Sequence, residues 1–185
     1  MRRTTRMRWR TSVALLGVLL WATSASAAGL LDGLKDEDFE EQPLWQENAV
    51  QLPPAPQDTH LYSFYVSPTT THRFFVDIQN LSVGNDGVVR YTLVILSPSG
   101  AKNVSFEGMR CEARARRIYA SGRADGSWSP SKNERWLPVR EAVANRQHAA
   151  LFTDFFCPGG VMNYRLEEIQ KTFKKEGRPL SEAPS

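Results

Sequence analysis

The middle of the chain alternates hydrophobic and polar positions with a period of two residues, which is typical of β-strands with one buried face. The clearest case is residues 88–97, where Val89, Tyr91 and Leu93 share one face. Other candidate strands are rich in aromatic and β-branched side chains, and they cover residues 61–67, 73–79 and a stretch that begins at Val104. Together with the segment described next, this pattern predicts a sheet of about five strands.

Residues 109–120 are the ambiguous part of the pattern. Their Arg, Ala and Glu residues favour a helix by propensity. The same residues also alternate, with Arg110, Arg114 and Arg116 on one face and small side chains on the other. The neighbouring strands and the turn that follows lead us to expect a strand here.

The C-terminal third has helical spacing instead. Residues 141–156 place apolar side chains about one helical turn apart, and Pro158 and Gly159 follow as stop signals. Residues 163–176 repeat the spacing and gather lysines near their end, where a helix favours cations. The predicted fold class is therefore α+β: an antiparallel sheet of about five strands followed by two C-terminal helices packed on one face.

The N-terminus has the three parts of a secretory signal peptide. Five arginines precede residue 11, an apolar run covers residues 13–21, and Ala25 and Ala27 form a small-x-small cleavage pattern. We expect cleavage after Ala27, so that residues 1–27 are removed and the mature chain acts in the periplasm or cell envelope. The alternative is an uncleaved anchor, but the apolar run is about half the roughly 20 residues that span a bilayer. We therefore expect no transmembrane segment after processing.

Composition divides the rest of the chain into three parts. Residues 28–57 are acidic and then rich in proline, which predicts a flexible N-terminal arm. Residues 58–176 are long enough for a single α+β domain with its own core. Residues 177–185 are expected to form a disordered tail.

The charge of the chain changes when the leader is set aside. Of 23 basic and 20 acidic residues, five basic residues and no acidic residue lie in the leader. The remainder has 18 basic and 20 acidic residues, a formal net charge of −2. General nucleic-acid binding loses its electrostatic support, so we expect no nucleic-acid partner.

The sequence contains two cysteines, Cys111 and Cys157. An even number of cysteines in an exported protein indicates a disulfide, although two buried free thiols are the alternative. The pair has no nearby histidine or second cysteine pair that would complete a metal site, so we expect no metal. No cofactor motif is present, and we expect no cofactor.

Two stretches resemble a known family. They are FEGMRCEARARRIYASGRADGSW at residues 106–128 and FFCPGG at residues 155–160. Within them, the matching features are the Gly-x-Arg-Cys step that ends at Cys111, the Tyr119-Ala120 and Gly122-Arg123 pairs, and Cys157-Pro158. The pattern is similar to the CNP-like family of small exported proteobacterial proteins. The resemblance covers roughly residues 58–170. It implies a single exported domain of unknown function, and it implies no reaction.

An arginine-rich face is the main candidate for a binding site. Guanidinium groups can hold a phosphate or carboxylate through paired hydrogen bonds, and tryptophans in loops can stack on sugars or on a partner. The candidate binding residues are Arg110, Arg114, Arg116, Arg123, Trp128 and Trp136. The candidate ligands are envelope anions, namely lipid or lipopolysaccharide phosphate and peptidoglycan carboxylate, and an envelope protein is the other candidate partner.

Structural explanations exist for the same residues. Charge runs commonly form solvated faces, and tryptophans commonly cap a core. In a third interpretation, the acidic residues 32–41 lie on the arginine face and mask it.

An enzyme is the alternative function, and no catalytic residue can be named with a complete motif. The three histidines show no HExxH spacing, and no serine lies in GxSxG. His148, Asp154 and one of the serines could in principle form a dispersed hydrolase site. We therefore interpret the chain as a non-catalytic module that binds an anionic ligand or a protein partner, with a small periplasmic hydrolase as the alternative.

Overall fold

The computed structural model describes residues 44–141, 146–163 and 165–182. The expected signal peptide and the acidic residues 32–41 lie outside these ranges. Within them, no helix combines the length and the apolar character that crossing a membrane requires.

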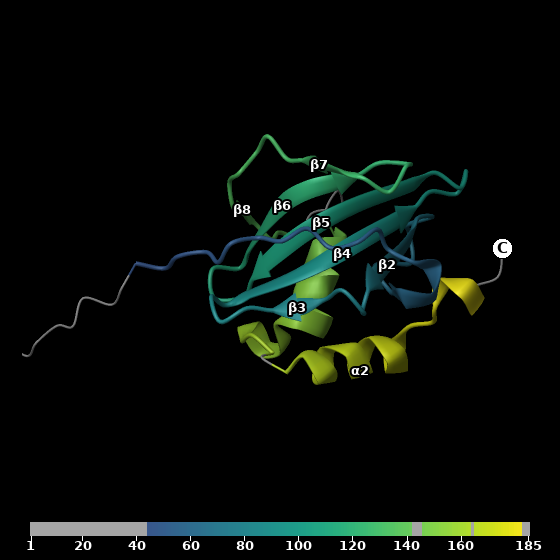
Figure 1. Ribbon diagram of the computed structural model, residues 1–185. Coiled ribbons are helices and arrows are strands. Elements are labelled where there is room, and N and C mark those ends of the chain that lie inside the picture. The colour runs from purple at the N-terminus through teal and green to yellow at the C-terminus, as the bar shows by residue number, and fades with distance from the viewer. Residues whose placement is uncertain (1–43, 142–145, 164, 183–185) are drawn as a thin grey trace, which may run out of the picture. The chain divides into compact units, whose positions relative to one another are not determined.

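An antiparallel sheet forms the body of the protein, with the strand order β1-β2-β4-β5-β6-β7 (Figure 1). Two short strands are added at its margins, where β3 pairs with β4 and β8 pairs with β6. The strands are β1 (Leu61–Phe64), β2 (Arg73–Asp77), β3 (Ser82–Val83), β4 (Val88–Leu96), β5 (Lys102–Arg110), β6 (Ala115–Gly122), β7 (Trp128–Pro130) and β8 (Leu137–Pro138).

The central strand β4 follows the predicted alternation. Val89, Tyr91 and Leu93 belong to the main hydrophobic core. Val94 lies in a second, smaller cluster, and Arg90 points to the same side of the sheet as Val94 because successive side chains of a strand alternate. The two faces of the sheet are thus chemically different.

Two C-terminal helical segments cover the face that carries Tyr91 (Figure 1). The first is α1 (Arg146–Ala150), which continues as a π-helix, η3 (Leu151–Phe156). The π-helix ends with a hydrogen bond from the Cys157 N–H to the Phe152 carbonyl, five residues earlier. The second is α2 (Leu166–Glu176). Short 3₁₀ turns complete the described elements: η1 (Asp58–His60), η4 (Pro158–Gly160) and η5 (Leu180–Glu182). The predicted fold class, an antiparallel sheet followed by two helices, is confirmed.

Aromatic packing holds the helices on the sheet. The rings of Phe155 in η3 and Phe173 in α2 stack with centroids 4.2 Å apart. Phe64 of β1 meets both rings edge-on, and Tyr91 lies 4.8 Å from Phe156. Such pairs add about 0.5–1.5 kcal/mol each beyond the area that they bury.

The expectation of one continuous strand over residues 109–120 is wrong. β5 ends at Arg110, the chain reverses through a tight turn, and β6 begins at Ala115. The turn is closed by a hydrogen bond from the Arg114 N–H to the Cys111 carbonyl, and Arg114 has a φ of 45°. The alternation continues through this turn in the sequence, so periodicity alone did not reveal it.

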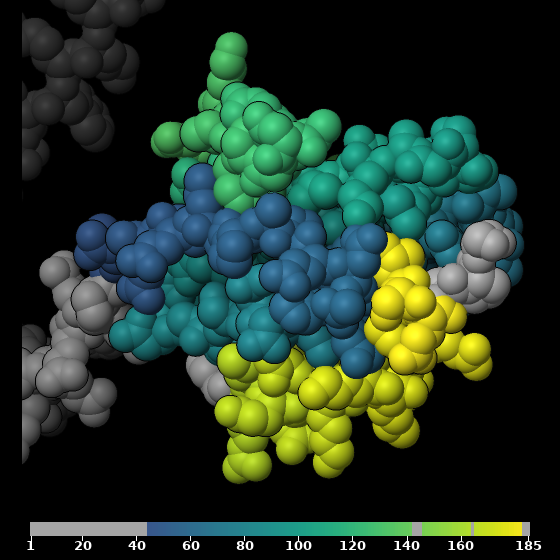
Figure 2. All heavy atoms as spheres, turned by 45° about the vertical axis from the view of Figure 1, so that its right-hand side comes forward, coloured from purple at the N-terminus to yellow at the C-terminus, as the bar shows by residue number. Residues whose placement is uncertain are grey.

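The described part of the expected flexible arm lies along the sheet. Residues 44–57, named the strap here, run extended across the face opposite the helices (Figures 1 and 2). At the other end of the chain, residues 177–182 belong to the segment expected as a disordered tail. They lie against β1, where the Ser63 N–H bonds the Arg178 carbonyl. A Cβ on Gly177 would lie 2.0 Å from the Ser63 carbonyl oxygen, so glycine permits this close approach.

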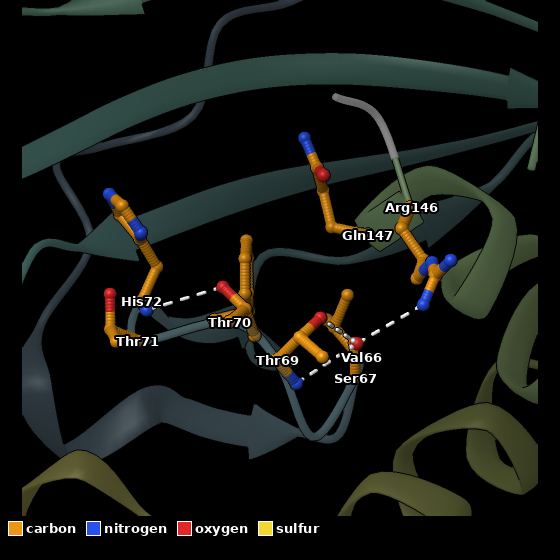
Figure 3. A pocket seen from close by; sticks show the side chains of 9 residues that line it. Val66, Ser67, Thr69, Thr70, Thr71, His72, Arg146 and Gln147 are labelled. Atoms are coloured by element: carbon orange, nitrogen blue, oxygen red, sulfur yellow. Dashed lines mark hydrogen bonds between the residues drawn. The ribbon is translucent and has the colours of Figure 1, made fainter. Parts of the chain in front are cut away.

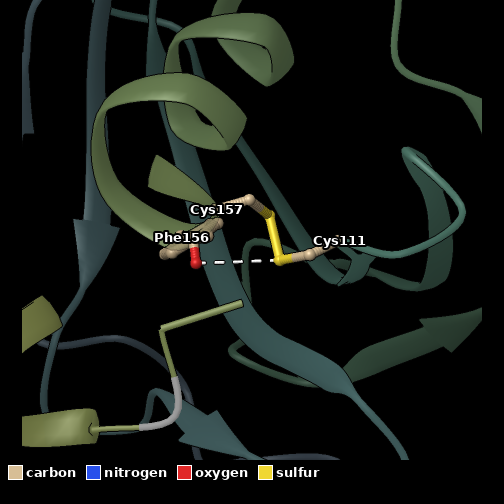
Figure 4. Close-up of a disulfide and its surroundings, with 3 residues drawn as sticks. All are labelled: Cys111, Phe156 and Cys157. Carbon is tan, nitrogen blue, oxygen red and sulfur yellow. Dashed lines mark hydrogen bonds between the residues drawn. A yellow bond between two sulfur atoms is a disulfide. The ribbon is translucent and has the colours of Figure 1, made fainter. Parts of the chain in front are cut away.

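Cys111 and Cys157 lie at disulfide distance, with Cα atoms 5.5 Å apart (Figure 4). Cys111 follows β5, and Cys157 follows η3. The two cysteines therefore lie close enough for the predicted disulfide, which ties the end of η3 to the β5–β6 turn.

Candidate anion-binding site

The three arginines predicted to share one face are directed to three places. Arg110 lies under the strap, 3.9 Å from the ring centroid of Trp45. Arg114 lies in the β5–β6 turn, 4.8 Å from the Phe152 ring. Arg116 pairs with Met109 across the sheet and points to the helix side. The turn at residues 111–114 breaks the alternation and separates these side chains.

Arg123 and Trp128 do meet, in a cavity of about 440 Å³ that Lys102 and Gly122 also line. Its charges are partly balanced, because Lys102 pairs with Asp58 at 2.7 Å. The Arg123 guanidinium donates to the Ser127 hydroxyl and to the Trp128 carbonyl. The Trp128 indole is itself held by a 2.7 Å hydrogen bond to the Pro53 carbonyl of the strap.

Trp136 belongs instead to a cluster around Glu47 of the strap. The Glu47 carboxylate accepts hydrogen bonds from Arg117 at 2.7 Å, from the Tyr119 hydroxyl and from the Trp136 indole at 3.4 Å. Trp136 also meets Trp45 edge-on. Burial, and next the hydrogen bond to Glu47, raise the pKa of Tyr119 far above its ordinary value. The cluster holds the strap on the sheet.

Beside this cluster, Arg90 forms a nearly buried ion pair with Asp86 at 2.5 Å. Burial alone would raise the pKa of Asp86, but the hydrogen bond and charge of Arg90 and the Asn48 N–H outweigh it and lower that pKa. The Trp45 indole donates to the Asp86 carbonyl. An arginine-lined face therefore exists, but its arginines are engaged by Glu47, Asp86 and Trp45.

A buried polar network lies on the other face of the sheet. Glu107 is 2% exposed, and it accepts hydrogen bonds from Ser105 at 2.6 Å and from Tyr91 at 3.0 Å. His148 of α1 contacts the same carboxylate at 2.8 Å. Burial alone would raise the pKa of Glu107, but His148, then Ser105 and Arg116, outweigh it and lower that pKa. Burial and Glu107 raise the pKa of Tyr91 well above its ordinary value.

This network brings a histidine, an acid and a serine together in an order that does not suit nucleophilic catalysis. A catalytic triad needs the histidine between the nucleophile and the acid. Here Glu107 lies between Ser105 and His148, so the serine hydroxyl donates its hydrogen bond to the acid and not to the histidine. His148 is 3% exposed, which leaves no room for a substrate. We interpret the network as an attachment of α1 to β5.

A second cavity, named the hydroxyl cavity here, lies between the loop that joins β1 to β2 and the first residues of α1 (Figure 3). Its volume is about 250 Å³. Arg146 and Gln147 of α1 approach it from one side and the loop from the other. The lining residues are Val66, Ser67, Thr69, Thr70, Thr71, His72, Phe74, Arg146 and Gln147.

Hydrogen bonds order the hydroxyl groups of this loop. Ser67 is buried, and its Oγ lies 2.9 Å from the Thr69 hydroxyl and accepts a 3.1 Å hydrogen bond from Arg146. The Thr70 hydroxyl accepts the His72 N–H. The Arg146 guanidinium is thus directed at a hydroxyl group, and no ion pair of Arg146 is found among the described residues.

Among the described residues, no carboxylate lines the hydroxyl cavity. Glu141 and Asp154 border Arg146 only in a separate depression, and Glu141 already pairs with Arg114 at 3.4 Å. A guanidinium beside several hydroxyl groups is an arrangement that suits an oxyanion, because all of these groups can donate hydrogen bonds.

Sequence reasoning missed the hydroxyl cavity. The Ser-Pro-Thr-Thr-Thr-His run at residues 67–72 was a visible signal, because it places hydroxyl groups in a loop between two strands. Arg146 lies 79 positions from Ser67 in the sequence, so only the fold could bring it to this loop.

The sequence model of the CNP1-like family matches residues 40–174, which include the loop and α1. The chain belongs to this family. This membership confirms the resemblance seen in residues 106–128 and 155–160.

Among curated proteins, Cryptic neisserial protein 1 of Neisseria gonorrhoeae is 26% identical over 152 residues. The alignment covers 72% of this chain and 74% of that relative. No solved structure matches the chain.

Proposed function

We propose that this CNP1-like protein is an exported, non-catalytic module of the periplasm or cell envelope that binds an anionic group in the hydroxyl cavity. The observation that carries the proposal is the Arg146 guanidinium, which faces the hydroxyl groups of Ser67 and its neighbours with no carboxylate among the described residues that line the cavity. A small anion bound there would pair with the Arg146 guanidinium and accept hydrogen bonds from the hydroxyl groups.

The proposed compartment is supported by the cysteine pair and by the N-terminal sequence. Cys111 and Cys157 lie at disulfide distance, and disulfides persist in oxidising compartments. Residues 1–27 have the pattern of a signal peptide. The intact mass of the exported protein tests this part, because it should correspond to a chain that begins at Ala28. A mass that retains the first arginines would contradict it.

The anion site is tested by titrating the protein with methyl phosphate while recording amide chemical shifts. We expect shifts concentrated in residues 66–72 and 146–147. Arg146→Gln should weaken binding about tenfold or more, because a hydrogen bond to a charged group contributes about 1.5–3 kcal/mol. Arg146 is exposed, so this substitution should leave the fold intact.

Arg123→Gln is the matched control. Arg123 is also an exposed arginine with hydroxyl and carbonyl partners, but it lines the cavity of Trp128. Its replacement should leave methyl phosphate binding unchanged. The reverse result, with Arg123→Gln losing binding and Arg146→Gln keeping it, would overturn the assignment and move the anion to the cavity predicted from the sequence.

A further inference from the structure

An apolar groove adjoins the hydroxyl cavity. Its volume is about 450 Å³, which lies within the range of about 300–1,000 Å³ that small-molecule sites occupy. The groove and the hydroxyl cavity adjoin each other, because five residues line both, namely Val66, Ser67, Thr70, His72 and Phe74.

The surface of the groove is more apolar than polar, although six polar or charged residues also line it: Ser63, Ser67, Thr70, His72, Arg73 and Arg178. Phe64, Phe74 and Phe75 contribute from β1 and β2, and Tyr65 and Val66 contribute from the start of the loop. Tyr65 is 70% exposed, which is unusual for a large aromatic side chain beside an apolar depression. A ligand that lies in the groove would cover its ring.

The charged groups at the groove have one sign among the described residues. Arg73 and Arg178 line it, with Arg73 5.8 Å from the ring centroid of Phe75, and Arg146 lies in the adjoining hydroxyl cavity. No described carboxylate lines the groove. An occupant would therefore have an apolar part for the aromatic walls and an anionic part for the guanidinium and hydroxyl groups.

We propose that the combined site takes a single-chain amphiphile with a phosphate head, such as an alkyl or acyl phosphate, with the head in the hydroxyl cavity and the chain in the groove. This inference rests on the proposed function, because the head occupies the same anion site. A tetrahedral phosphate presents more acceptor oxygens than a carboxylate, and the hydroxyl groups of Thr69, Thr70 and Thr71 offer matching donors beside Arg146.

The test is a titration of the protein with methyl, butyl, hexyl and octyl phosphate, each kept below the concentration at which it forms micelles. A fully buried methylene group raises affinity about fourfold, so a half-buried chain gains about twofold per methylene. Octyl phosphate should therefore bind on the order of 100-fold more tightly than methyl phosphate.

Two exposed apolar residues provide the variant and its control. Tyr65→Ser should reduce the gain from chain length several-fold and leave methyl phosphate binding unchanged. Val161→Ser replaces a side chain that is 67% exposed but lies outside the groove. It should change neither the gain from chain length nor the binding of methyl phosphate. Octanoate and octyl glucoside test the head, and both should bind at least tenfold more weakly than octyl phosphate.

The outcomes separate the two proposals. Equal binding of methyl and octyl phosphate would overturn the amphiphile and keep the anion site. Failure of every phosphate to bind would remove both. Octanoate or octyl glucoside binding as tightly as octyl phosphate would overturn the phosphate head. Binding to phosphatidylglycerol vesicles without binding to monomeric octyl phosphate would also overturn the inference, because it would show adsorption to a charged membrane surface.

Discussion

Replacing Glu47 tests whether the strap is part of the folded domain. The carboxylate is 15% exposed and is the acceptor for Arg117, Tyr119 and Trp136. It also lies 3.8 Å from Arg90. Glu47→Ala removes all of these interactions and leaves the donors of Arg117, Tyr119 and Trp136 without this acceptor.

The expected cost follows from those contacts. A hydrogen bond that involves a charged group contributes about 1.5–3 kcal/mol, and contacts within one network do not add fully. Arg90 keeps Asp86, and the strap can detach so that water reaches the freed donors. We therefore expect Glu47→Ala to lower the free energy of unfolding by about 3 kcal/mol. Glu47→Gln keeps an acceptor oxygen and should cost about 1–2 kcal/mol.

Urea unfolding followed by tryptophan fluorescence measures both variants, since Trp45 and Trp136 lie in the cluster. Gln46→Ala is a suitable control, because Gln46 is an exposed strap residue beside Glu47. A Glu47→Ala variant within 0.5 kcal/mol of the wild type, which is the usual range for surface substitutions, would refute the reasoning. It would mean that the strap does not stabilise the fold.

Two further predictions concern the core. Replacing Cys111 or Cys157 by Ser should cost about 4 kcal/mol in the chain-entropy treatment of a loop that spans 46 positions, and peptide mapping without reductant should recover the linked pair. The pKa of Glu107 is lowered in the folded state, so the ionised carboxylate contributes fully to the free energy of unfolding above the ordinary value of 4.5. This contribution is lost as the pH falls from 4.5 through the lowered pKa of the folded state. Urea midpoints from pH 6 to pH 3 should fall for the wild type and fall less steeply for Glu107→Gln; equal slopes would contradict the proposed role of Glu107.

The fold class could be predicted because it depends on local pattern. The alternation of Val89, Tyr91 and Leu93 identified the central strand, and the helical spacing of residues 163–176 identified α2. Pairing of Cys111 with Cys157 followed from their number alone. The prediction of one strand over residues 109–120 was wrong because a tight turn can interrupt an alternating pattern of polar and small residues without Gly or Pro.

The candidate sites could be predicted only in part, because each of them joins distant segments. Arg123 and Trp128 are close in sequence and do line one cavity. Glu107 and His148, or Ser67 and Arg146, are brought together by the packing of α1 on the sheet. A glutamate between apolar positions of a strand, as in Phe106-Glu107-Gly108-Met109, signals a buried partner, but it does not say which residue that partner is.

The sequence by itself determined the fold class, the order of sheet and helices and the number of cysteines, since these depend on neighbouring residues and on composition. Only the tertiary structure decided what the arginines do. Their charge is fixed by residue type, but their availability depends on which partner the fold brings within hydrogen-bond distance. Glu47 and Trp45 come from the strap and engage Arg117 and Arg110, whereas Arg146 donates a hydrogen bond to the Ser67 hydroxyl.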